Sequence, residues 1–152
     1  MDWGTKVVLV MHGISAMITA GAAVHNGLLS IKHLLGKDVS SRLVRVYPQI
    51  ILWGFLSTFL MGLWIYPDFV VRVRKPWLDQ QMPMATGLFE IKEHWLGIAL
   101  ALAFFSASRC RTIDLRGPSL DRGLFHLCAI SLMLVVLYSA VLGMVLVSVR
   151  SI

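Results

Sequence analysis

The sequence is poor in charge and in cysteine. Only 14% of its 152 residues are Asp, Glu, Lys or Arg, and its two cysteines, Cys110 and Cys128, form no CxxC or CxxCH pattern. This argues against a structural disulfide and against covalently attached c-type haem. The sequence also lacks a phosphate-binding loop, a nucleophile elbow and a zincin motif, so soluble hydrolase chemistry is not indicated.

Long hydrophobic runs take the place of these features. Hydrophobic residues make up 57% of the chain, whereas soluble domains have roughly 45–50%, and the mean hydropathy is +0.76. A helix needs about 20 largely apolar residues to cross a bilayer. Four such segments are present, at approximately 7–31, 46–66, 88–107 and 124–149. We therefore predict an all-α, integral membrane four-helix bundle that forms one domain over 1–152.

The third segment is the least regular, because its strictly apolar part starts only at Trp95. To reach spanning length it must include Glu90, Lys92, Glu93 and His94. Charged side chains are costly in hydrocarbon. We therefore place its first turn and a half at or below the lipid headgroups.

The connection over 67–87 is the longest in the chain. Its 69–74 stretch partly alternates between apolar and basic residues, and Pro76 follows. Amphipathic segments favour the plane of the membrane interface. We expect an interfacial loop that lies along the surface, where it could close over a site.

Basic residues set the expected orientation, since Lys and Arg are enriched in short cytoplasmic loops. Four crossings put both termini and the 67–87 connection on one side, the terminal side. The opposite side holds eight basic residues: Lys32, Lys37, Arg42, Arg45, Arg109, Arg111, Arg116 and Arg122. The terminal side holds six: Lys6, Arg72, Arg74, Lys75, Lys92 and Arg150. We therefore expect a bacterial inner membrane protein with its termini on the outer, periplasmic side.

The formal net charge of +6 does not indicate a nucleic acid partner, because the basic residues flank the apolar segments. Basic residues in these positions meet anionic lipid headgroups. We expect the lipid bilayer as the direct partner and no nucleic acid.

Histidines carry the main functional signal. Ionisable residues inside a membrane are costly and by default face the protein interior. His12 lies about six residues, and His94 about seven, into their segments from the terminal side, which at 1.5 Å per residue puts them at similar depth. This geometry suits bis-histidine ligation of a planar cofactor, with His12 and His94 as the first-choice ligands.

A second pairing lies nearer the opposite side, where His25 and His33 bracket the level of His126. His12 and His25 are 13 residues apart, a rise of about 20 Å that suits two stacked haems. On an ideal helix that spacing also leaves them about 140° apart, whereas 14 residues would nearly align them. One haem therefore fits better than two. We place His33 among the lipid headgroups.

The four-helix outline and the positions of His12, His25, His94 and His126 resemble the membrane-embedded b-type cytochromes, the helical subunits of quinone-linked respiratory complexes. The resemblance implies haem b, one or two, held between histidines of neighbouring helices. It also implies electron transport alongside other subunits and a quinone, rather than the work of a self-sufficient enzyme.

A dense polar cluster surrounds His94. A quinone that reacts at the interface must exchange protons with water, and Glu90 or Glu93 could relay them. The alternative role is structural, because carboxylates in a first turn interact favourably with the helix dipole.

Other interpretations remain open. Small residues in the first segment permit close helix packing, which would suit a cofactor-free structural or assembly subunit. Copper could draw thioether and imidazole ligands from Met11, His12, Met82 and Met84. A di-iron carboxylate site needs a paired Glu-x-x-His arrangement, of which the sequence has one partial match.

Overall fold

The chain is helical through nearly all of the part that the structure describes. A computed structural model describes residues 2–115 and 119–149. Its elements are α1 (Trp3–Leu34), α2 (Ser41–Phe69), η1 (Val70–Leu78), α3 (Asp79–Gln81), α4 (Pro83–Arg109) and α5 (Leu120–Val149). The all-α prediction is confirmed. Arg116 and Arg150, two of the basic residues on which the expected orientation depends, lie outside the described residues.

Within the described residues, three helical stretches are long and apolar enough to cross a membrane: Trp3–Leu34, Ser41–Gln81 and Leu120–Val145. α4 is of similar length, but Glu90, Lys92 and Glu93 interrupt its first half. The described helices therefore divide into three clear candidate spans and one helix with a charged first half.

The long helices extend past the predicted apolar runs. α1 begins four residues before 7–31 and ends three after it, and α4 begins five residues before 88–107. Hydropathy marks the apolar part of a helix, whereas backbone hydrogen bonds continue through polar ends. α1 ends just before Gly36, whose φ of 74° suits glycine and reverses the chain.

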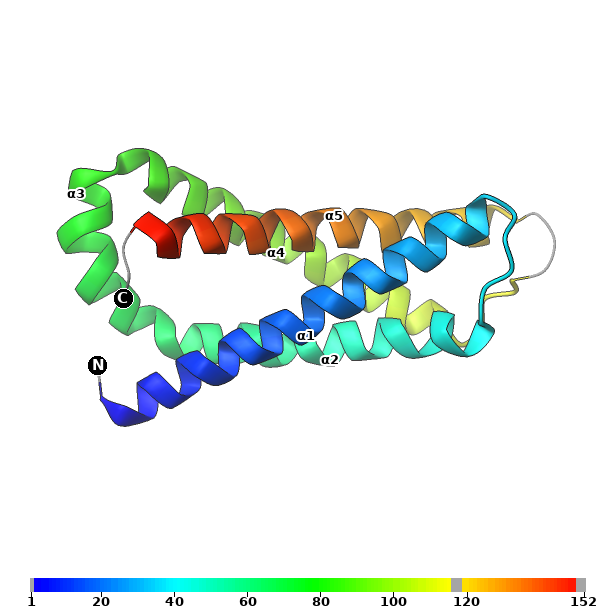
Figure 1. The fold of residues 1–152 in the computed structure, drawn as a ribbon, viewed down its shortest axis with the longest axis horizontal. Coiled ribbons are helices and arrows are strands. Elements are labelled where there is room, and N and C mark those ends of the chain that lie inside the picture. The colour runs from blue at the N-terminus through cyan, green and yellow to red at the C-terminus, as the bar shows by residue number, and fades with distance from the viewer. Residues whose placement is uncertain (1, 116–118, 150–152) are drawn as a thin grey trace.

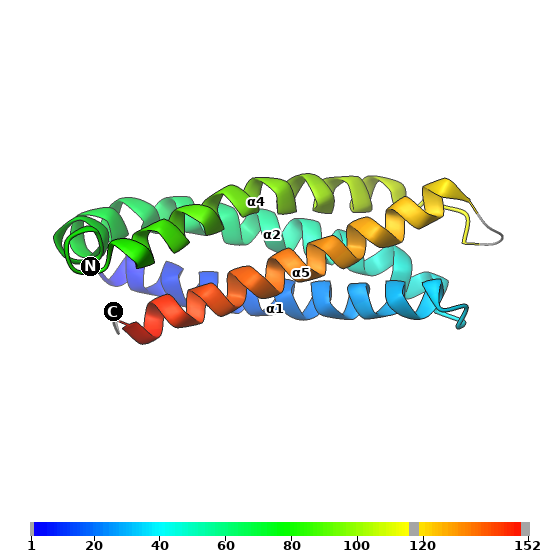
Figure 2. The same cartoon turned by 90° about the horizontal axis from the view of Figure 1, so that it is seen from above.

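The four long helices pack side by side (Figures 1 and 2). α1 contacts α2 and α5, and α4 contacts the same two helices. Among the described residues α1 and α4 do not contact each other, so they lie on a diagonal. The start of α1 and the end of α5 lie at the same end, called here the terminal end; the α1–α2 and α4–α5 connections lie at the other, the connecting end.

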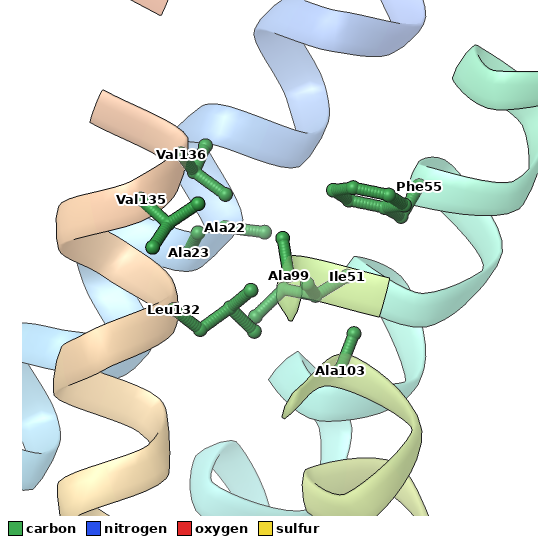
Figure 3. Close-up of a cluster of buried hydrophobic side chains, with 9 residues drawn as sticks. All are labelled: Ala22, Ala23, Ile51, Phe55, Ala99, Ala103, Leu132, Val135 and Val136. Atoms are coloured by element: carbon green, nitrogen blue, oxygen red, sulfur yellow. The ribbon is translucent and has the colours of Figure 1, made fainter. Parts of the chain in front are cut away.

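The apolar core fills the middle of this arrangement (Figure 3). All four long helices contribute to it: Ala22, Ala23, Ile51, Phe55, Ala99, Ala103, Leu132, Val135 and Val136. A second cluster lies toward the connecting end, formed by Val44, Cys110, Ile113 and Phe125. Alanines on α1 and α4 let these helices approach their neighbours closely.

Burial is uneven along the helices. No described α2 residue after Phe55 is buried, and α1 has one buried residue, Thr5, before Thr19. On α4 the single buried residue before Ala99 is Ala85. The terminal half of the arrangement is therefore packed far more loosely than the middle and the connecting end.

α1 reverses the usual pattern of a soluble helix. Its buried face carries Thr19, Asn26 and Ser30, each less than 5% exposed, whereas Met17 and Ile18 are more than half exposed. An apolar outer face and a polar inner face suit a helix surrounded by lipid, where hydrogen bonds and small residues hold helices together.

The 67–87 connection is not a loop along most of its length, contrary to the prediction. α2 runs on to Phe69, and η1 is a π-helix in which the Asp79 N–H bonds the Arg74 carbonyl oxygen. The chain breaks at Met82, with φ −142° and ψ 67°, before α4 begins. Pro76 has no N–H to donate, and the surrounding turns are wound more widely than an α-helix.

Arg74 fixes this helical connection to its neighbours. Its guanidinium donates to the Tyr66 hydroxyl at 3.1 Å and to the Glu90 carboxylate, and it lies 3.6 Å from Asp79. These contacts join α2, α3 and α4 through one side chain. They set where α4 begins and hence where its charged first half lies.

Asp2 caps α1, and the cap should be sensitive to pH. Its Oδ1 accepts from the Thr5 hydroxyl and, at 2.9 Å, from the Thr5 N–H, and these bonds lower the pKa of Asp2 below its usual value. Because the pKa of Asp2 is lowered in the folded state, the cap stabilises the helix fully at pH values above the ordinary pKa of Asp. This stabilisation is lost as the pH falls through the folded-state pKa. The Thr5 amide NMR shift should report fraying of the first turn below about pH 4. A shift that does not change down to pH 2 would contradict this.

Candidate functional site

His12 lies on the inner face of α1. It is 18 residues, or five full turns, before the buried Ser30 and seven before the buried Thr19. Its Nδ1 lies 2.9 Å from the Thr58 carbonyl oxygen, so Nδ1 carries the proton and donates it. No other hydrogen bond of the ring is found among the described residues, which leaves Nε2 with a free lone pair.

Polar contacts between α1 and α2 hold His12 in place. The Ser15 hydroxyl donates to the Gly54 carbonyl oxygen at 3.2 Å, and the Thr58 hydroxyl donates to Ser15 Oγ at 3.0 Å. A Cβ at Gly62 would lie 3.4 Å from His12 Cε1, so the glycine gives the ring its space. The imidazole is thus held by the backbone and small residues of α2.

His94 faces the other way. It is nine residues from both Ala85 and Ala103, which on an α-helix is about 180° around the axis from these buried positions. Its side chain is exposed, and its Nδ1 donates to the Glu90 carbonyl oxygen one turn earlier at 2.8 Å. His12 and His94 therefore lie on diagonal helices, one facing in and one facing out, and the structure does not bring them together.

Lys92 occupies the inner face where His94 was expected. It is seven residues before the buried Ala99, nearly two full turns. Its Nζ lies 5.7 Å from the Phe89 ring centroid and 3.9 Å from the point where a Cβ at Gly143 would lie. Its positive charge also acts on His12. The sequence held the signal for this placement, because Ala99 and Ala103 mark the small-residue face of α4.

The two candidate relay carboxylates also differ in surroundings. Glu90 is exposed and is bound by the Arg74 guanidinium, while its backbone carbonyl holds His94. Glu93 is half-buried and interacts electrostatically with its neighbour Lys92. Neither carboxylate is hydrogen-bonded to the His94 ring in the described structure, so the relay role stays a prediction.

At the connecting end the structure forms a histidine pair that the sequence did not suggest. His126 on α5 is fully buried, and its Nδ1 lies 3.0 Å from Ser30 Oγ on α1. Its ring centroid is 4.7 Å from that of His33. His25, its expected partner, is exposed and shares a 2.6 Å hydrogen bond with the Tyr47 hydroxyl. His33, placed by the sequence among headgroups, lies half-buried against His126 instead.

Within the described ranges, no three His, Cys, Asp or Glu side chains gather in a position to hold a metal ion. Of the methionines suggested for copper, Met84 is 84% exposed and Met11 53% exposed. The copper and di-iron interpretations therefore gain no support from the geometry.

Comparisons with protein-family models, with curated proteins and with solved structures find no match for this chain.

Proposed function

We propose that the chain is an integral membrane four-helix bundle that binds b-type haem and carries electrons as a subunit of a quinone-linked complex. The three apolar helical stretches support membrane insertion. α4 contacts α2 and α5 (Figure 2). Its Lys92 Nζ lies 3.9 Å from where a Cβ at Gly143 of α5 would stand, so this charge is directed at a neighbouring helix rather than at lipid. α4 therefore serves as the fourth crossing, which agrees with the start of α1 and the end of α5 lying at one end. That end faces the periplasm of a bacterial inner membrane in this proposal.

The observation that carries the haem proposal is the presentation of His12. Histidines that bind a metal usually donate their other ring N–H to a carbonyl or carboxylate, which fixes the tautomer and the ring orientation. His12 has this arrangement, with Nδ1 on the Thr58 carbonyl and Nε2 free. It also lies in the terminal half of the bundle, where few side chains are buried. When bound there, haem would supply a one-electron couple whose potential the surroundings tune.

His12 and His94 could each bind a haem iron separately, but they do not fit one haem as the predicted pair of ligands. His94 has the same Nδ1 anchoring as His12 but projects from the outer face of α4. An exposed, ionisable side chain at this depth is costly in lipid. We infer that His94 faces another subunit of the complex, while His12 faces the bundle interior.

A reduced-minus-oxidised visible spectrum of the detergent-purified protein, expressed with added haem precursor, tests this proposal. A Soret band and a reduced α band are expected in the wild type. His12→Ala should remove the haem and both bands. His33→Ala is the matched control and should keep the spectrum. Absence of a Soret band when haem is supplied, or an unchanged spectrum in His12→Ala, would overturn the proposal. Loss of the band in His94→Ala as well would restore the predicted pair.

A cofactor-free structural subunit is the second candidate. Four histidines, His12, His25, His94 and His126, each have a protein hydrogen-bond partner. The centre of the bundle is filled by apolar side chains. A structural subunit would show no absorbance in the visible spectrum, and haem would not raise its melting temperature.

A further inference from the structure

We propose that His33 and His126 bind one divalent transition-metal ion at the connecting end. The site lies between the last turns of α1 and the first turns of α5. It is separate from His12, so it does not rest on the haem proposal.

The first support is a buried nitrogen without a partner. His126 is fully buried, its Nδ1 contacts the Ser30 hydroxyl, and its Nε2 has no hydrogen-bond partner among the described residues. Leaving a buried polar atom without a hydrogen bond is unfavourable. In the tautomer in which the Nδ1–H donates to Ser30 Oγ, the Nε2 lone pair is free to bind a metal, and Ser30 fixes the orientation of the ring.

His33 supplies the second imidazole. It follows Ser30 by three residues on α1, so both lie on one face of the helix. Its ring is tilted by 39° to that of His126. His33 is half-buried, whereas His126 is fully buried, so His33 offers the ion a route from the solution at this end.

The spacing of the rings fits one shared ion. A metal–nitrogen bond of about 2.0–2.1 Å places the ion about 3.2 Å from each ring centroid. Two imidazoles on one ion would then have centroids about 4.5 Å apart at a right angle and about 5.2 Å apart at a tetrahedral angle. The observed 4.7 Å lies between these values. Ligands on opposite faces of a haem would need about 6.4 Å, so this pair as placed does not straddle a second haem.

The donor set indicates the class of ion. Imidazole nitrogens suit zinc, copper, nickel and iron, whereas calcium and magnesium prefer oxygen ligands. The positive charge of Arg122 acts on His126, and its guanidinium donates to the Leu115 carbonyl oxygen at 3.2 Å. This charge opposes the ion, so we expect an exchangeable site, with solvent completing the coordination.

Titration with Co²⁺ tests the site, using haem-free protein in detergent without a polyhistidine tag. One equivalent should bind per chain, with visible ligand-field absorption that Zn²⁺ abolishes by displacement. His33→Ala and His126→Ala should each weaken the apparent affinity about tenfold or more. His25→Ala is the matched control, because it removes a histidine of the same helix that lies against Tyr47.

Circular dichroism should confirm that each variant is folded, and the half-buried His33 keeps the test valid if His126→Ala does not fold. Equal Co²⁺ binding in wild type and His33→Ala would overturn the proposal. So would the absence of binding in the wild type, which would make the two rings a stacked pair only. Neither result bears on the Soret band of the haem test, so the two proposals fail separately.

Discussion

Ile51→Ala is expected to lower the free energy of unfolding in detergent micelles by about 2–5 kcal/mol. Ile51 is fully buried at the centre of the apolar core, where α1, α4 and α5 surround it (Figure 3). Truncation leaves a cavity that the surrounding helices can only partly fill. The lost contacts are dispersion contacts, which detergent or lipid cannot replace inside a closed core.

Ile50 provides the matched control for this measurement. It precedes Ile51 on α2 and is 39% exposed on the outer side of the helix. Ile50→Ala exchanges contacts with detergent and should change the free energy of unfolding by less than about 1 kcal/mol. Equal losses in the two variants, measured by reversible denaturation, would show that the buried cluster is not the core of the folded protein.

Gly27→Ala is expected to destabilise the contact between α1 and α5 by about 1–3 kcal/mol. A Cβ at position 27 would lie 2.5 Å from the Met133 sulfur and 2.8 Å from the Met133 Cβ. A rotation can move the sulfur, but the Met133 Cβ is fixed to its helix. The two helices must therefore separate or shift, which weakens the neighbouring contacts.

Gly21→Ala should have the opposite sign. In the part of the chain that the structure describes, nothing lies within 4 Å of a Cβ at Gly21, and alanine favours a helix over glycine by about 1 kcal/mol. The double variant Gly27→Ala with Met133→Ala should recover part of the loss, because it removes the contacts with the Met133 sulfur and Cγ and leaves only the Cβ contact. A neutral Gly27→Ala would mean that α1 and α5 do not approach as closely as the structure shows.

Hydropathy located the helices but not their ends. The four apolar runs are recovered as four long helices, because a run of about 20 apolar residues forms a helix wherever the backbone must bond internally. It did not reveal that 67–87 is helical. Three basic residues, Arg72, Arg74 and Lys75, and three prolines gave that stretch the composition of a loop. Its π-helical winding and the Arg74 contacts are tertiary features that local composition does not encode.

The candidate site was harder to predict than the fold. Residue counts along the helix axes give the depths of His12 and His94, but they do not tell which face of its helix each histidine occupies. Counting from Ala99 and Ala103 would have placed Lys92 inside and His94 outside. The His33–His126 pair could not be predicted from the sequence, because it depends on which turn of α5 packs against Ser30 of α1.

The polar contacts between α1 and α2 have a consequence for how the protein is made. Hydrogen bonds from His12, Ser15 and His25 join α1 to α2, and these two helices are consecutive in the chain. In a membrane such bonds, and not the hydrophobic effect, bring inserted helices together. The α1–α2 hairpin can therefore assemble in the bilayer while the ribosome is still synthesising α4. It would then act as the template on which the second hairpin docks, so a nascent chain stalled after η1 should already hold its first two helices paired.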